Sequence, residues 1–167
     1  MDIQVVPVTL DEKEILRNLY EKYAYEFSQY NGLDVNPLGL YGFKYLDHYW
    51  TQAGCFPFFI KVDARLAGLI LVNNYPEDAD ETDYTMSEFF VMHKYRKQGV
   101  GRYAASFVFD RFKGCWQLKR HPKNLASVRF WDSVVTQYTH GDYRMVRTGP
   151  EGAYADGTPG EVLLFRT

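Results

Sequence analysis

Apolar residues recur with two different periods along the chain, and the changes of period divide it into strands and helices. Apolar or β-branched runs predict strands at residues 3–8, 58–62, 66–73, 84–92, 115–118, 138–147 and 161–166. Apolar positions three and four residues apart predict helices at 11–30, 99–112 and 124–136, with a short aromatic helix at 41–50. This order of elements indicates a mixed sheet covered by helices, an α/β (α+β) fold.

Turn residues support several of these boundaries. Asn31-Gly32 ends the first predicted helix, because glycine readily takes the left-handed conformation that follows a helix. Asp63-Ala64 separates two predicted strands so narrowly that they should form an antiparallel hairpin. Loops rich in glycine, proline or acidic residues are expected at 33–41, 76–83 and 148–160.

The composition fits one globular domain spanning residues 1–167. The chain is 46% hydrophobic, which at this length allows a substantial core. No apolar run approaches the length of a membrane span and the N-terminus lacks a signal sequence, so we expect a cytoplasmic protein with no membrane partner. Two reduced, buried thiols are the expected state of Cys55 and Cys115; a disulfide or a reactive thiol is the alternative.

Positive charge is concentrated in one part of a chain whose net charge is only -2. Between His93 and Arg129 lie ten of the 19 Lys and Arg residues and a single acid, Asp110. A local basic field in a nearly neutral chain fits a small polyanionic ligand better than a long nucleic acid. We therefore expect no nucleic-acid partner, and an RNA-binding domain remains the weaker alternative.

The segment 87–113 carries the clearest candidate for an anion site. An apolar strand ending in Phe89–Met92 leads into a basic turn, and a helix begins near Gly99. The amides of such a turn and the positive end of the helix dipole point at one place. Gly99 and Gly101 lack the Cβ atoms that keep a phosphate from the amides, although they also suit a tight turn. Three basic residues flank the turn: Arg96, Lys97 and Arg102.

Two nucleotide-binding motifs fit this turn poorly. Gly99 to Ala104 formally matches the dinucleotide fingerprint G-x-G-x-x-A. However, six residues, His93 to Gln98, separate it from the strand, and no acid follows about 20 residues later to bind a ribose. A Walker-type loop is excluded because no Gly-Lys-Ser/Thr is present.

A third interpretation explains two motifs together. Arg96-Lys-Gln-Gly99-Val-Gly101 resembles the Arg/Gln-x-x-Gly-x-Gly/Ala signature of the GNAT superfamily of acetyl-CoA-dependent N-acetyltransferases. Asn124-Leu-Ala126-Ser-Val-Arg-Phe130-Trp131 looks like that superfamily's Asn-x-x-Ala-x-x-Phe-Tyr helix start. The resemblance covers nearly the whole chain. It implies a GNAT-like mixed, mostly antiparallel sheet of about seven strands, with helices on both faces and a splay between strands 4 and 5.

The resemblance also implies a binding site for acetyl-CoA. Amides from Lys97 to Arg102 would bind the diphosphate, and Arg102 or Lys97 would reach the 3′-phosphate. The strand through Phe90 would pair its backbone with the pantetheine arm, and an amide near Phe90 or Val91 would polarise the thioester carbonyl. Asn124 would contact the arm, or act only as a helix cap. The implied cofactor-binding residues are Phe90, Val91, Met92, Arg96, Lys97, Gln98, Gly99, Val100, Gly101, Arg102 and Asn124.

The catalytic groups are less evident. Glu88, just before the strand residues expected to bind the arm, is our candidate general base, with a carboxylate paired to a neighbouring strand or loop as the alternative. The family's usual general acid is a Tyr, but this sequence has Trp131 at that position. Tyr138, another tyrosine or solvent would then protonate the leaving thiolate.

The acceptor is expected to be an amine of a small molecule or a peptide. Segments that contact the acceptor in this family are rich here in aromatic and acidic residues, which suits an apolar or cationic amine; the alternative is that most of these rings form core or a homodimer face. The four histidines show no metal-ligand spacing, so we expect no metal. The predicted function is N-acetyltransferase, and the alternative is a non-catalytic acyl-CoA-binding module on the same fold.

Overall fold

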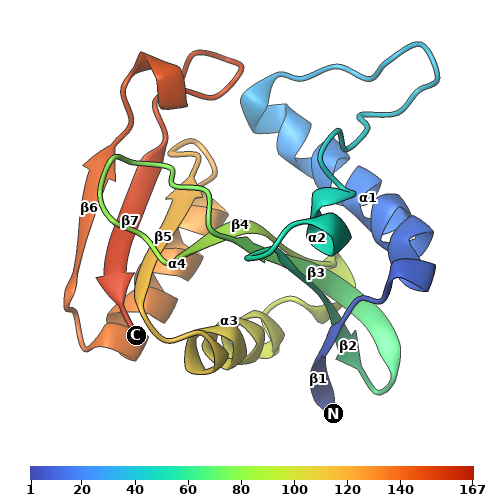
Figure 1. Ribbon diagram of the computed structural model, residues 1–167, viewed down its shortest axis with the longest axis horizontal. Coiled ribbons are helices and arrows are strands. Elements are labelled where there is room, and N and C mark those ends of the chain that lie inside the picture. Colours follow the sequence, from blue (N-terminus) through green and yellow to red (C-terminus); the bar gives the residue numbers. More distant parts are fainter.

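The computed structural model describes residues 1–167, and its centre is a seven-stranded sheet in the order β1-β2-β3-β4-β5-β7-β6 (Figure 1). All neighbouring strands are antiparallel except β4 and β5, which are parallel. The predicted mixed, mostly antiparallel sheet is therefore confirmed. The strands are β1 Ile3–Pro7, β2 Phe56–Val62, β3 Arg65–Asn73, β4 Tyr84–Val91, β5 Cys115–Arg120, β6 Tyr143–Arg147 and β7 Glu161–Arg166.

The sheet opens between its two parallel strands. β4 and β5 are paired only at Tyr84 with Trp116, Thr85 with Gln117 and Met86 with Leu118. Beyond Met86, β4 continues to Val91 beside β3, whereas β5 continues beside β7. The splay predicted between strands 4 and 5 is thus confirmed.

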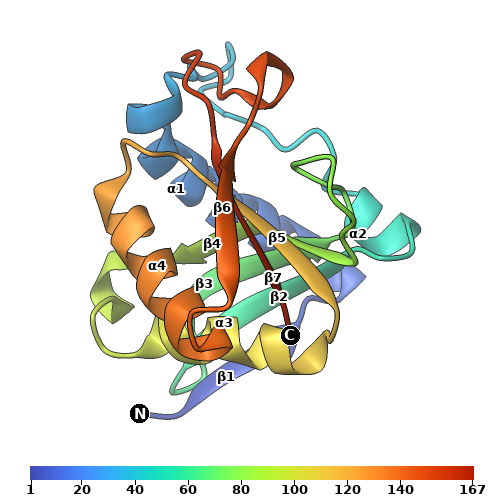
Figure 2. The same ribbon diagram turned by 90° about the vertical axis from the view of Figure 1, so that its left-hand side faces the viewer.

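Helices cover both faces of the sheet, as predicted (Figure 1, Figure 2). α1 (Lys13–Asn31) and α2 (His48–Thr51) lie on one face, and α3 (Val100–Arg111) and α4 (Leu125–Thr139) lie on the other. Three short 3-10 segments lie at Leu10–Glu12, His93–Tyr95 and Pro150–Gly152. None of the helices combines the length and apolar character needed to cross a membrane.

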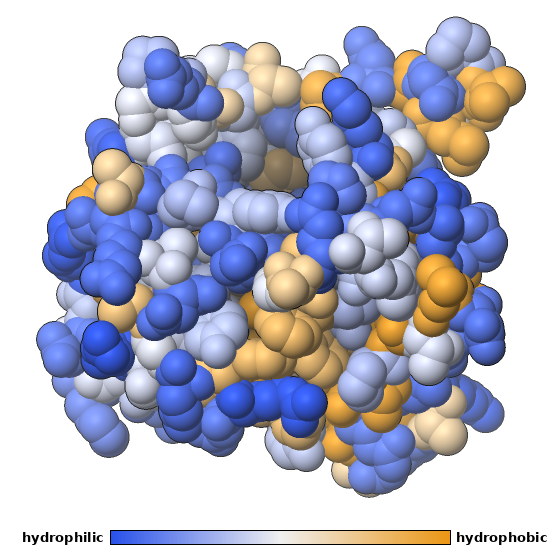
Figure 3. Space-filling model, in the orientation of Figure 1, coloured by the Kyte–Doolittle hydropathy of each residue, from blue (hydrophilic) through white to orange (hydrophobic).

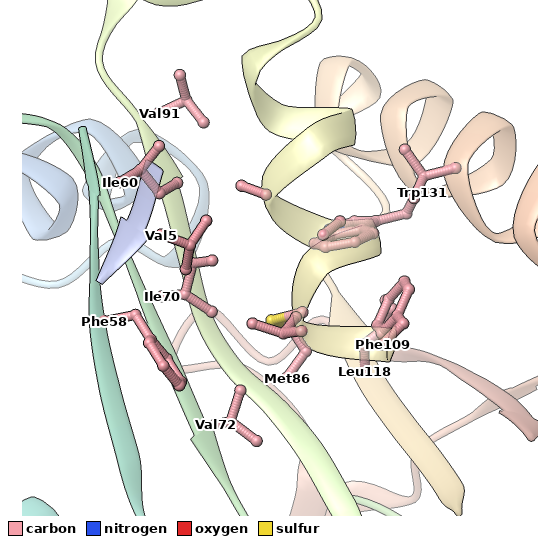
Figure 4. Packing of buried hydrophobic residues seen from close by; sticks show 14 of the residues in the cluster. Val5, Phe58, Ile60, Ile70, Val72, Met86, Val91, Phe109, Leu118 and Trp131 are labelled. Carbon is pink, nitrogen blue, oxygen red and sulfur yellow. The ribbon is translucent and has the colours of Figure 1, made fainter. Parts of the chain in front are cut away.

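Each face of the sheet has its own apolar core. On the α3–α4 face, Met86 and Leu118 of the parallel strands pack with Phe109 of α3 and Trp131 of α4 (Figure 4). On the α1 face the core includes Leu16, Leu19, Leu69, Leu71 and Phe90. Burying a side chain of this size contributes about 1.5–3 kcal/mol, so both helical layers hold β4 in place.

Local turn signals were predicted correctly. Gly32 follows α1 with φ 74°, and its amide donates to the carbonyl of Ser28. Asp63 and Ala64 have φ 48° and 63°, the positive values that a two-residue hairpin turn requires.

Cys55 is buried and Cys115 is half-buried, and both are free thiols.

The predicted aromatic helix at 41–50 is wrong over most of its length, because only His48–Thr51 is helical. Gly42 has φ 74°, which is incompatible with a helix there. The carboxylate of Glu21 also accepts the amides of Tyr41 and Gly42, at 2.9 and 2.7 Å. A long-range contact with α1 therefore replaces the helical hydrogen bonds of this segment.

The predicted strand at 138–147 begins too early. Tyr138 belongs to α4, which continues to Thr139, and β6 begins only at Tyr143. His140 and Gly141, with φ 55° and 84°, end the helix and turn the chain. The polar break in the pattern thus marks the end of a helix and not a kink within a strand.

The close approach of β3 and β4 gives a stability prediction. Gly68 of β3 lies opposite Val91, and a methyl group on it would overlap the carbonyl oxygen of Phe90. Gly68→Ala should therefore lower the free energy of unfolding by about 1–3 kcal/mol in urea denaturation. Gly149→Ala, where no atom lies within 4 Å of the new methyl group, is the matched control. Equal stability of the two variants would contradict this packing.

Candidate active site

The turn that leads into α3 presents free amides, as expected for an anion site. Lys97 and Gly99 have φ 59° and 83°, and Gly99 is the N-cap of α3. The first intrahelical bond is from the amide of Tyr103 to the carbonyl of Gly99, so the amides of residues 100–102 have no helical acceptor. No atom lies within 4 Å of the Cβ position of Gly99. We call residues 97–102 the amide turn.

The three flanking basic residues take different positions. Arg96 forms two hydrogen bonds with the carboxylate of Glu26, at 2.7 and 2.8 Å, and its Nε donates to the carbonyl of Val91 at 2.6 Å. Its charge is thus paired, and it ties α1 to the end of β4. Arg102 donates to the hydroxyl of Ser133 on α4 at 2.8 Å. Lys97 and Arg102 are both exposed and neither forms an ion pair, so both basic residues of the amide turn are free to meet an anion.

The remaining predicted residues of this region also differ in what surrounds them. Val100 is buried in the core, whereas Gln98 is exposed and donates to the carbonyl of Lys94. At Gly101, a Cβ atom would lie 3.0 Å from the ring of Phe130, so this glycine lets α3 pack against α4. Gly99, and not Gly101, therefore provides the open approach to the amides.

Asn124 is the N-cap of α4 and accepts the amide of Ser127 at 3.1 Å. The helix-cap interpretation is therefore correct for its carbonyl oxygen. Its side-chain nitrogen donates to no protein group and remains available to a ligand. Capping and cofactor contact are thus compatible at this residue.

The backbone of β4 presents alternate amides to the opening of the sheet. The pairing of β3 and β4 shifts at Ser87, which has no partner and forms a bulge. The amide of Met92 donates to the carbonyl of Ala67 at 2.8 Å. Because hydrogen bonds alternate along an antiparallel pair, the amide of Phe90 points toward β3 and that of Val91 points away from it. Val91 therefore fits the predicted thioester contact.

A cavity of about 380 Å³ lies where the sheet opens, and we call it the main cavity. It is bounded by α1, β4, β5, α4 and the loops at 33–42 and 148–160. The surface in this region is hollowed between two raised parts of the chain (Figure 3). Residues from all these elements line it, among them Tyr23, Phe27, Glu88, Phe89, Ser127, Trp131 and Tyr154.

Glu88 is half-buried in the wall of the main cavity, and no basic group lies within salt-bridge distance of it. Burial raises the pKa of its carboxyl to about 7. The hydroxyl of Tyr23 lowers this pKa and the charge of Glu77 raises it, while Lys119 lowers it slightly. A carboxyl group with a pKa near neutrality suits general base catalysis.

Tyr138, the tyrosine named as a candidate general acid, does not lie at the main cavity, whereas other tyrosines do. The hydroxyl of Tyr138 donates to Asp110 at 2.7 Å and accepts from Lys113 at 2.9 Å. Trp131 does line the cavity, at the position of the family's usual Tyr. Tyr154, which sequence analysis missed, lies in the cavity wall, and burial raises its pKa far above its usual range.

Ion pairs satisfy the basic side chains around the main cavity. Lys119 lies 3.1 Å from Glu77, and Arg120 contacts both Asp132 and Glu161 at 2.6 and 2.9 Å. The loop at 148–160 is held to the end of β5 by Asp156, which contacts His121 at 3.3 Å and Lys123 at 3.1 Å. Nowhere do three or more His, Cys, Asp or Glu side chains form a group that could hold a metal ion.

An open mixed sheet and a helix that begins at a turn with free amides are the features that the GNAT resemblance implies. The sequence model of the acetyltransferase (GNAT) family matches residues 14–134. The chain therefore belongs to this family, which uses acetyl-CoA. No curated protein matches the chain.

Solved structures show the same fold at low sequence identity. An acetyltransferase from Thermus thermophilus is 14% identical with a TM-score of 0.70, covering 100% of this chain and 98% of its own. The ribosomal-protein-S18-alanine N-acetyltransferase from Escherichia coli is 12% identical with a TM-score of 0.65, covering 98% and 92%. PaiA N-acetyltransferase from Thermoplasma acidophilum, in complex with coenzyme A, is 11% identical with a TM-score of 0.60, covering 100% of both chains.

The raised pKa of Glu88 predicts a pH-dependent cost in stability. Its value of about 7 in the folded protein lies above the ordinary 4.5, so the folded state holds this proton more tightly. The cost is absent below about pH 4.5, grows as pH rises toward 7 and is constant above that value. Glu88→Gln should thus be more stable than the native protein by about 1–3 kcal/mol at pH 8, with little difference at pH 4.5.

Urea unfolding at both pH values measures this difference. Exposed Glu151→Gln is the control and should change the stability equally at both. If Glu88→Gln also shows no pH-dependent gain, the Glu88 carboxyl is not destabilised by burial.

Proposed function

We propose that residues 1–167 act as one N-acetyltransferase domain that moves an acetyl group from acetyl-CoA directly to a primary amine of a small molecule or a peptide. One observation carries the proposal: β4 and β5 separate after Met86, and the carboxyl group of Glu88 lines the cavity at this opening. The opening lets a donor reach β4 from the α3–α4 face, where the free amides lie. Glu88 then faces the place where an amine must attack.

The donor would be held mainly by backbone groups. The amides of residues 97–102 bind the diphosphate, as helix N-termini commonly do, and Lys97 adds an unpaired charge, with Lys97 or Arg102 reaching the 3′-phosphate. The free edge of β4 at Phe90–Met92 accepts the pantetheine arm as a further strand would lie, and Asn124 contacts it from α4. Arg96 supports the donor site indirectly. Its Nε donates to the carbonyl of Val91 and so fixes the end of β4 and the start of the turn.

Glu88 and Val91 supply the chemistry. Ionised Glu88 takes a proton from the acceptor ammonium, and the free amine forms a C–N bond with the acetyl carbon. The amide of Val91 stabilises the negative charge on the carbonyl oxygen. The C–S bond then breaks, the nitrogen releases its second proton to solvent to leave the neutral amide, and the thiolate takes a proton from solvent or from a tyrosine. Four tyrosines line the main cavity: Tyr20, Tyr23, Tyr41 and Tyr154. Burial raises the pKa of Tyr20, Tyr23 and Tyr154, which makes these three weaker proton donors and favours solvent for this step.

The presence of Trp131 favours a second candidate function, acyl-CoA binding without catalysis. An indole N–H is a poor acid, so the residue at the position of the family's usual general acid cannot protonate the leaving thiolate here. A non-catalytic module would bind acetyl-CoA at the amide turn but release no thiol in the presence of amines. Turnover therefore separates the two functions.

Calorimetric titration with acetyl-CoA tests the donor site. Lys97→Glu should weaken binding roughly 10-fold or more, because it places a negative charge beside the diphosphate. Arg111→Glu is the matched control, since it makes the same charge change at the exposed far end of α3. Failure of the native protein to bind acetyl-CoA, or equal binding by both variants, would contradict the donor site.

The pH dependence of turnover tests Glu88. The value of kcat/KM should rise with pH through an ionisation near the pKa of about 7 and then level off, because only the carboxylate accepts a proton. Glu88→Gln should lower kcat about 100-fold and remove this inflection. Thiol release with a fixed amine measures both enzymes, and the amine's own ionisation affects them equally. A native profile in Glu88→Gln would exclude Glu88 as the base.

A further inference from the structure

A second cavity of about 320 Å³ adjoins the main cavity, and the two share only Ser87 and Glu88. We propose that this second cavity is the acceptor site, and that it takes a small primary amine with an aromatic or aliphatic body and no carboxylate. The inference rests on the proposed N-acetyltransferase function and adds the acceptor class. Six further residues form its walls: Phe43, Tyr45, His48, Tyr49, Asn73 and Tyr75.

The position of Glu88 between the two cavities gives the second one its role. A donor that enters through the opening of the sheet occupies the main cavity, because Ser127 and Trp131 of α4 line this cavity and Asn124 caps the same helix. An amine in the second cavity then has the same carboxyl group at its inner end. The base thus stands between donor and acceptor, which a direct transfer requires.

The polar groups in the second cavity are largely satisfied by the protein itself. Asn73 donates to the hydroxyl of Tyr49 at 3.1 Å and accepts the amide of Tyr75 at 3.1 Å. The hydroxyl of Tyr75 is bonded to Gln52 and Cys55. The cavity therefore offers aromatic faces and one carboxyl group, a combination that attracts an ammonium ion with an apolar body.

Charge excludes an acceptor that carries a carboxylate. No Lys or Arg lines the second cavity, and His48 is its only group that could become positive. Lys13 is paired with Asp47, the residue before His48, at 2.5 Å, and the ammonium of Lys44 lies 5.4 Å from the centre of the Tyr45 ring. Since Glu88 would repel a second carboxylate, amino acids are poor acceptors.

The size of the cavity favours a small molecule. Its volume lies at the low end of the range of small-molecule sites, about 300–1,000 Å³. Tyr45 and Tyr75, which are 53% and 44% exposed, stand at its outer side, while Tyr49 and Asn73 are buried. An amine of the size of 2-phenylethylamine can therefore place its nitrogen near Glu88 and its ring among the tyrosines.

Three amines with the same ring test the charge argument. 2-Phenylethylamine should be acetylated with a kcat/KM at least about 10-fold above that of phenylalanine, which adds only a carboxylate. Phenylalanine amide keeps the bulk without the charge, and it should lie nearer to 2-phenylethylamine. Equal rates for 2-phenylethylamine and phenylalanine would overturn the proposed acceptor class.

A variant of the outer wall tests the location. Tyr45→Ala should raise the KM for 2-phenylethylamine roughly 10-fold through loss of one aromatic face, without changing kcat or acetyl-CoA affinity. Tyr25→Ala is the matched control, because Tyr25 is 73% exposed and lines neither cavity. An unchanged KM in Tyr45→Ala would overturn the second cavity as the acceptor site.

Equilibrium binding of 2-phenylethylamine in the presence of coenzyme A separates this inference from the proposed function. Binding that Tyr45→Ala weakens, with no acetylation of any amine, would support the amine site and contradict the transferase. Acetylation of amines with no effect of Tyr45→Ala would support the transferase and contradict the site. Absence of both binding and acetylation would overturn both.

Discussion

The central constraint on this molecule is that β4 and β5 pair at three positions and then separate. β5 can leave because it is fully paired with β7 on its other side, and β4 can continue because it is paired with β3. Each strand thus keeps its backbone bonds along one edge, apart from the bulge at Ser87, while its other edge faces a cavity. A free strand edge usually promotes aggregation, but here α1, α4 and the loop at 148–160 enclose it.

The site places a carboxyl group where the fold alone would favour an apolar side chain. Phe90, two residues along β4 from Glu88, is buried in the core on the α1 face, and Glu88 lies toward the same helix. Its raised pKa is the physical result of this placement. A carboxyl group that titrates near neutral pH is costly to the folded state, and here it is the same group that we propose as the general base.

Sequence analysis succeeded where the determining interactions are local. Period-two and helical patterns located all seven strands and the three long helices, and the amide turn was evident from Gly99 and its basic neighbours. It failed where distant residues decide the structure. Glu21 draws the 41–50 segment away from a helix, and Glu26 takes up the charge of Arg96 from 70 residues away. The second cavity likewise joins α2, β3 and β4, which no spacing in the sequence connects.

The pairing of Glu26 with Arg96 has a consequence for how this fold can be recombined. Glu26 lies in the N-terminal half, which supplies most of the residues that line the second cavity, and Arg96 lies in the half that supplies the amide turn. A chimera that joins the first half of one family member to the second half of another inherits the two residues from different parents. If only one of the two residues is present, its half-buried charge has lost its ion-pair partner. A chimera whose parents both carry this ion pair avoids that cost.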